Sequence, residues 1–204
     1  MDLIESVLDL EVQPKSKYQR FVEFKTAENI EDYHYFVGID LLTRYNDSVE
    51  LHKQLVQRFH KVIKDSVTAI VDDEDILMIT PVGDAAIVGL KCDWSQIEQV
   101  VKYLRAVIHE NNKEDAKRRI EYKIAVHFGT IFQFTDVNNE IGITGEGIDF
   151  VSDILQKSTT GKFFISEQAF KKISETRKIK FKSQKSFKFK PNGHAINVYE
   201  YRLD

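Results

Sequence analysis

The chain has 204 residues, of which 42% are hydrophobic and 30% charged, and its formal net charge at pH 7 is −3. This length buries one sizeable core, and the slightly acidic balance argues against a protein that coats nucleic acid by counterion release. The single cysteine, Cys92, excludes a disulfide framework and a multi-cysteine zinc site.

Two further features bear on the compartment. No segment comes near the ~18–20 consecutive apolar residues that cross a bilayer. Acidic residues stand in the N-terminal stretch where a secretory signal carries lysine or arginine. The sequence therefore predicts a soluble, cytoplasmic protein that binds neither membrane nor nucleic acid.

Residues 1–30 are predicted to be a lead-in segment, and residues 31–204 a single domain. Aromatic and β-branched runs predict strands, and apolar residues at helical spacing predict helices. A capping-box spacing, with Asp47 as N-cap and Glu50 three residues later, marks the start of the first helix. In chain order the sequence predicts strand 33–40, helix 48–63, strands 67–71, 76–80 and 85–90, helix 94–112, a long strand 120–134, helix 145–158, strand 163–165, a helix capped by Ser166, and antiparallel strands up to residue 201.

This order contains a βαββαβ core, so the predicted fold is ferredoxin-like α+β with additions. Within it, Asp40 ends the first strand and Asp84 lies in the turn of a later hairpin. If these elements are neighbours in the sheet, both carboxylates project from one edge. Such a pair suits Mg²⁺ or Mn²⁺, which prefer hard oxygen ligands and share them with phosphates. The general alternative is that both are ordinary turn residues.

Five segments in this order resemble the class III nucleotidyl cyclase catalytic domain, over about residues 33–202. They are YFVGIDLLTRY, PVGDAAIVGL, KIAVHFGTIF, GEGIDFVSDILQKSTTGKFFISEQAF and INVYEYRL. The resemblance implies a homodimer whose two active sites are each built from both chains. It also implies two Mn²⁺ or Mg²⁺ ions per site, held by Asp40 and Asp84 with Leu41 as a further metal contact. The implied reaction is in-line attack of the ribose 3′-hydroxyl on the α-phosphate with loss of pyrophosphate.

The same resemblance suggests where the nucleoside triphosphate binds. Nucleotide contacts are expected at Leu42, Thr43, Arg44 and Tyr45, at Met78, and at Lys190. Arg44 is the candidate catalytic residue that stabilises the transition state. Lys188 or Lys190 lies where the family's late lysine reaches the triphosphate, although a solvated strand face also explains these lysines.

Four positions depart from the family pattern. Met78 stands at the purine-selecting lysine, and Gly142 at the residue that reads an adenine amino group. Asp149 replaces the ribose-orienting asparagine, and Asp153 the transition-state arginine. The first two changes remove adenine recognition, and the last two bring negative charge toward a polyphosphate, which electrostatics opposes.

The retained metal carboxylates together with the lost purine contacts resemble the bacterial pyrimidine cyclases of Pycsar anti-phage systems. These make cyclic UMP or cyclic CMP as a signal for a separate effector, which implies UTP, slightly favoured over CTP, as substrate. Two alternatives stay open: a catalytically inactive cyclase-like module that binds a nucleotide or a partner, and a plain ferredoxin-like scaffold that binds a protein. His127, on an apolar strand, is predicted to be a core residue rather than a base.

Overall fold

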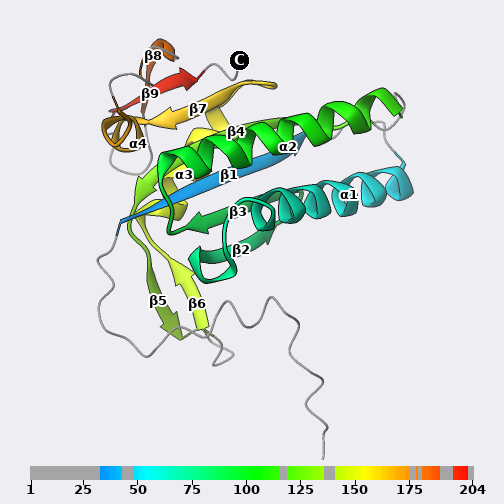
Figure 1. Ribbon diagram of the computed structural model, residues 1–204, viewed down its shortest axis with the longest axis horizontal. Helices are drawn as coiled ribbons and strands as arrows, with labels where there is room; N and C mark the ends of the chain where they lie inside the picture. The colour runs from blue at the N-terminus through cyan, green and yellow to red at the C-terminus, as the bar shows by residue number, and fades with distance from the viewer. Residues whose placement is uncertain are drawn as a thin grey trace, which may run out of the picture.

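The computed structural model describes residues 33–42, 48–114, 119–135, 141–174, 178, 181–188 and 195–201. A seven-stranded sheet in the order β2-β3-β1-β4-β7-β9-β8 forms its centre, and β5 and β6 form a separate ribbon (Figure 1). The strands are β1 (His34–Leu42), β2 (Ile76–Val82), β3 (Ala85–Leu90), β4 (Glu121–Gly129), β5 (Phe132–Thr135), β6 (Ile141–Thr144), β7 (Phe163–Ser166), β8 (Phe181–Lys188) and β9 (Ala195–Tyr201). The helices are α1 (Val49–Thr68), α2 (Trp94–Glu114), α3 (Glu146–Lys157) and α4 (Glu167–Lys171), with a 3-10 turn at Asp73–Asp75.

The first half of the sheet has the predicted ferredoxin-like core. β1 pairs antiparallel with both β3 and β4, and β2 pairs antiparallel with β3, which gives the order β2-β3-β1-β4. β7 then joins parallel to β4, and β9 and β8 follow antiparallel. The expected α+β fold class is therefore confirmed.

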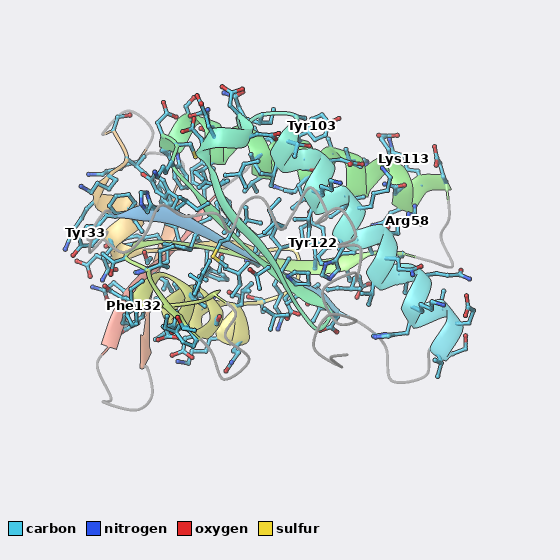
Figure 2. All side chains as sticks on the ribbon, turned by 90° about the horizontal axis from the view of Figure 1, so that it is seen from below. Tyr33, Arg58, Tyr103, Lys113, Tyr122 and Phe132 are labelled. Carbon is cyan, nitrogen blue, oxygen red and sulfur yellow. The ribbon has the colours of Figure 1, made fainter. Side chains whose placement is uncertain are left out.

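Helices cover both faces of the sheet. α1 and α2 lie over one face and α3 lies against the other, as Figure 2 shows from below. The residues of β1 alternate between the two cores: Val37 and Ile39 enter the larger core under α1 and α2, and Phe36 enters the smaller core under α3. A Cβ on Gly38 would lie 2.5 Å from Leu155 Cδ1, so α3 packs directly on β1. By this alternation, Asp40 faces the α3 side.

One predicted strand is wrong. Residues 67–71 belong to the end of α1 and the turn after it, because Val67 and Val71 continue the buried helical face of Ile63. The Ser66 hydroxyl donates to the Val62 carbonyl at 2.7 Å, and the Ala69 amide donates to the Asp65 carbonyl at 3.1 Å. Their β-branched composition favours a strand locally, but burial against the sheet selects the helix.

Two other boundaries differ from the prediction. The N-cap of α1 is Ser48, whose side chain accepts from the Leu51 amide at 3.2 Å, and Asp47 lies outside the described residues. The predicted strand 120–134 divides into β4 and β5, because the Thr130 carbonyl leaves the sheet and accepts from the Gly147 amide at 2.8 Å. α2, α3, β7 and the Ser166-capped α4 agree with the prediction.

The predicted lead-in segment, residues 1–30, lies outside the described residues. Among the helices that the structure describes, none is long and apolar enough to span a membrane.

Candidate functional site

Asp40 and Asp84 lie side by side at one end of the strands, two residues before β1 ends. Asp40 pairs with Ala85, the residue directly after Asp84, and the Leu41 amide donates to the Asp84 carbonyl at 3.2 Å. Gly83 takes a φ of 65°, the left-handed conformation that lets the β2–β3 turn bring Asp84 back beside β1. Both aspartates are half-buried.

The electrostatic state of Asp40 fits a site for positive charge. Burial raises the pKa of Asp40, the neighbouring charge of Asp84 raises it further, and Lys123 opposes the shift. Among the described residues, burial and the charge of Asp84 thus outweigh the stabilisation that Lys123 gives the ionised Asp40. A divalent cation would relieve both the burial cost and the repulsion. Among the described residues no three His, Cys, Asp or Glu side chains cluster, so further ligands there would be backbone carbonyls, phosphate oxygens or water.

Lys123 is a site residue that the sequence analysis missed. It lies opposite Asp40 in the β1–β4 pairing, and its Nζ is 3.9 Å from Asp40 Oδ2. This distance is longer than a hydrogen bond, so the ammonium can turn toward another anion. The signal in the sequence is the segment KIAVHFGTIF, but only the β1–β4 register shows that its lysine faces Asp40.

Solved structures with the same architecture come from nucleotide cyclases. The guanylyl cyclase Cya2 matches with a TM-score of 0.67 and 13% identity, over 83% of this chain and 91% of that one. The guanylate cyclase domain of RhGC from Catenaria anguillulae, solved in complex with GTP, has a TM-score of 0.56 and 15% identity, over 84% and 97%. A dimeric guanylyl cyclase domain of the RhoGC fusion protein from Blastocladiella emersonii has a TM-score of 0.57 and 14% identity, over 83% and 95%. The chain has the nucleotide cyclase fold.

The fold implied by the sequence resemblance is thus confirmed, and the cyclase fold is shared with adenylyl cyclase structures as well. No protein-family model and no curated protein sequence matches the chain. At such low identities a shared fold does not identify the substrate. The substrate has to be inferred from the side chains of the site.

Of the other metal and phosphate candidates near Asp40, the structure describes Leu41 and Leu42, the last two residues of β1. The Leu41 side chain is 2% exposed in the larger core, which leaves only its backbone for a ligand. Leu42 is half-buried and pairs with Glu121. Thr43, Arg44, Tyr45 and Lys190 lie outside the described residues, as does the side chain of Lys188.

Met78 lies away from the surface of the chain. Its side chain is 5% exposed in the smaller core under α3, and a Cβ on Gly89 would lie 3.0 Å from its Cγ. In this chain Met78 is a packing residue, and a nucleotide could reach it only if the core opened. The structure therefore does not bring Met78 together with Asp40 and Asp84 in an exposed site.

The remaining departures from the family pattern lie on or next to α3. Asp149 is exposed and Asp153 is half-buried on the helix, and Gly142 lies in β6 opposite Phe134. A Cβ on Gly142 would lie 2.6 Å from the Phe134 ring, so this position has no room for a side chain while the ring stays there.

His127 is a core residue, as the sequence predicted. It is 0% exposed, neither ring nitrogen has a hydrogen-bond partner, and Glu146 Oε1 is 3.8 Å from Nε2. Burial lowers the pKa of His127 to about 4. The ring is therefore neutral at pH 7.

Proposed function

We propose that the protein is a nucleotidyl cyclase, which converts a nucleoside triphosphate into its 3′,5′-cyclic monophosphate and pyrophosphate. The observation that carries this proposal is that Asp40 and Asp84 lie close together near the end of β1 in a cyclase fold. Two half-buried carboxylates, of which Asp40 has Lys123 as an ion-pair partner only at 3.9 Å, are costly to keep in a protein that only needs a stable scaffold.

In the proposed mechanism Asp40 and Asp84 hold two Mg²⁺ or Mn²⁺ ions, with the Leu41 backbone beside them. Bound ions of this kind supply Lewis-acid stabilisation of phosphate charge. Lys123 balances charge on the triphosphate, since its ammonium lies next to Asp40 without a tight hydrogen bond. The ribose 3′-hydroxyl gives its proton to solvent water and its oxygen bonds to the α-phosphorus, while the bond from that phosphorus to the bridging oxygen breaks and pyrophosphate leaves. Arg44 is the proposed transition-state cation, and Thr43, Tyr45 and Lys190 the further triphosphate contacts.

The proposed substrate is a pyrimidine nucleotide, with UTP favoured over CTP. Supporting this, the position at which the family reads an adenine amino group is Gly142, which has no side chain. Met78, at the purine-selecting position, is buried within one chain and carries no argument about the base. The solved relatives are purine cyclases by their names, so they share the fold rather than this feature. By the sequence resemblance, the product would act in the bacterial cytoplasm as an anti-phage signal to a separate effector.

The proposed assembly is a homodimer with two composite sites. The described part of one chain places Lys123 beside the aspartate pair, and the resemblance to the cyclase family implies that the base-binding wall comes from a partner. A second copy would supply that wall of the site. One of the matched cyclase domains is described as a non-canonical dimer, and others are described as monomeric.

A second candidate function is an inactive module that binds a nucleotide or a partner. The specific observation in its favour is Asp153, an acidic residue on α3 at the family's transition-state arginine. Negative charge there opposes phosphoryl transfer. The retained aspartate pair and Lys123 favour the enzyme.

The deciding experiment incubates the purified protein with each of the four nucleoside triphosphates and Mn²⁺ or Mg²⁺, and identifies the products by mass. We expect cyclic UMP, or cyclic CMP at a lower rate, and a loss of at least ~1,000-fold in Asp40→Asn and Asp84→Asn. Asp72→Asn, an exposed aspartate before the 3-10 turn, is the matched control and keeps full activity. No cyclic product from any triphosphate contradicts the enzyme, and ATP as the best substrate contradicts the pyrimidine assignment.

A further inference from the structure

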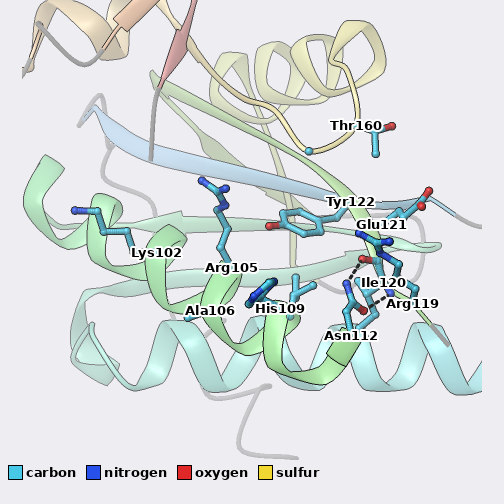
Figure 3. A pocket seen from close by; sticks show the side chains of 12 residues that line it. Lys102, Arg105, Ala106, His109, Asn112, Arg119, Ile120, Glu121, Tyr122 and Thr160 are labelled. Atoms are coloured by element: carbon cyan, nitrogen blue, oxygen red, sulfur yellow. Dashed lines mark hydrogen bonds between the residues drawn. The ribbon is translucent and has the colours of Figure 1, made fainter. Parts of the chain in front are cut away.

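A cavity of about 720 Å³ lies on the other face of the sheet from Asp40. It is bounded by α2, by the start of β4 and by the turn at Gly161 (Figure 3). Tyr122 and Lys123 are neighbours on β4 and therefore point to opposite faces. Tyr122 lines this cavity, whereas Lys123 lies beside Asp40. The cavity is thus separate from the candidate active site.

The lining of this cavity is basic in a chain that is acidic overall. Lys102, Arg105 and Arg119 line the cavity together with the acidic Glu121. The Lys102 ammonium is already paired with Glu98 at 2.7 Å, so the two arginines carry the excess positive charge. Arg119 is exposed at the rim. Figure 3 shows the Arg105 side chain rising from α2 beside Tyr122 of β4, and the two side chains are hydrogen-bonded. Such a concentration of arginine favours an anionic ligand.

The walls of the cavity are fixed by hydrogen bonds of the chain itself. Asn112 near the end of α2 bonds twice to Ile120: its Nδ2 donates to the carbonyl at 2.9 Å, and its Oδ1 accepts from the amide at 2.7 Å. On the other side, the Gly161 amide donates to the Tyr122 carbonyl at 2.9 Å. A cavity whose walls are already in place loses little entropy when a ligand binds.

We propose that this cavity binds a small molecule that carries a phosphate group. The planar guanidinium of Arg105 or Arg119 matches phosphate oxygens with two parallel hydrogen bonds, and the exposed Thr160 adds a hydroxyl. The volume lies in the range of ~300–1,000 Å³ typical of ligand pockets and exceeds what inorganic phosphate fills. The half-buried Tyr122 ring offers a flat apolar wall for an organic group. The ligand is therefore a phosphorylated organic molecule rather than a free phosphate ion.

The test is a titration of the ¹⁵N-labelled full chain, without divalent metal, with inorganic phosphate, ribose 5-phosphate and uridine 5′-monophosphate. We expect saturable shifts of the Tyr122 and Gly161 amides with the organic phosphates, and weaker binding of inorganic phosphate. Because the metal is left out and no turnover is measured, this result does not depend on the proposed cyclase activity. Shifts confined to the amides around Asp40 and Asp84 would overturn the proposal.

Variants assign the binding to this cavity. The double variant Arg105→Gln with Arg119→Gln should raise the Kd at least ~10-fold. Arg119→Gln alone, which changes an exposed residue, should raise the Kd several-fold. Its circular dichroism spectrum should stay that of the folded wild type. The control is Lys113→Gln, whose ammonium pairs with Glu110 at 2.9 Å on the last turn of α2, outside the lining. Equal affinities in the control and the arginine variants, or no binding at roughly 10 mM ligand, would also refute the proposal.

Discussion

Lys123 lies directly opposite Asp40 in the β1–β4 pairing, with its Nζ 3.9 Å from Asp40 Oδ2. Both side chains are largely buried, at 17% and 26% exposure. This lysine moderates the negative charge of the aspartate pair and also stands where phosphate charge would arrive. Its two effects can be separated by experiment.

We predict that Lys123→Gln lowers kcat/KM for the triphosphate by ~10–100-fold, because one positive charge is lost next to developing phosphate charge. Since Lys123 lowers the pKa of Asp40, its removal raises that pKa further. The acid limb of the pH–rate profile then moves to higher pH. The measurement is kcat/KM against pH.

The control for this variant is Lys171→Gln, which removes an exposed lysine on α4 whose ammonium lies 2.9 Å from the Glu167 carboxylate. It should leave both the rate and the profile unchanged. A Lys123→Gln enzyme with a lower rate but an unmoved acid limb would show that the lysine does not act on Asp40.

The sheet and the aspartate edge could be predicted from the sequence because each depends on local pattern. Asp40 lies near the end of the apolar strand β1, two residues before that strand ends, and Gly83-Asp84 is a turn between two strands, so their approach follows from the βαββαβ order. Lys123 could not be found that way, because strand register is set by packing on both faces of β1. The burial of Met78 was missed for the same reason, since the register shift in β2 between Ile76 and Met78 turns consecutive residues toward the same core.

Metal binding should stabilise the folded protein through Asp40 and Asp84. Saturating Mn²⁺ at about 100 times its Kd contributes ~2.7 kcal/mol, which raises Tm by several degrees in a domain of this size. Asp40→Asn and Asp84→Asn should lose this rise, and EDTA should reverse it in the wild type. The measurement is Tm by differential scanning calorimetry.

Without metal, Asp40→Asn should have a higher Tm than the wild type at pH 7. Burial and Asp84 raise the pKa of Asp40, so its ionised form disfavours the folded state, and stability is lost as pH rises through that pKa. Asp72→Asn, at an exposed position, should leave both Tm values unchanged. If Mn²⁺ raised the Tm of Asp40→Asn as much as that of the wild type, Asp40 would not be a metal ligand.

His127 predicts a separate pH dependence of stability. The pKa of His127 is about 4 in the folded chain, whereas an unperturbed histidine has a pKa of about 6.5, so between these values the unfolded chain binds a proton that the folded chain does not. The free energy of unfolding therefore falls as pH drops from 6.5 to 4, by about 3 kcal/mol for this group. The measurement is urea unfolding across that pH range.

In His127→Gln the free energy of unfolding should fall less steeply between pH 6.5 and 4 than in the wild type, whatever the absolute stability of the variant. His52→Gln, at a half-buried position on α1, should keep the wild-type slope. An unchanged slope in His127→Gln would mean that the buried ring is not the group that titrates.

Met78 gives a direct test of whether its position is core or nucleotide site. Because the side chain is 5% exposed between the sheet and α3, Met78→Lys buries an ammonium without a partner and should cost about 3 kcal/mol of unfolding free energy. Met78→Leu keeps the volume and should cost less than ~1.5 kcal/mol. If position 78 instead contacts the base in the assembled enzyme, Met78→Lys stays folded and shifts activity from UTP toward a purine triphosphate. Equilibrium unfolding together with product analysis on all four triphosphates separates the two outcomes, and a well-folded, purine-active Met78→Lys would contradict the core assignment.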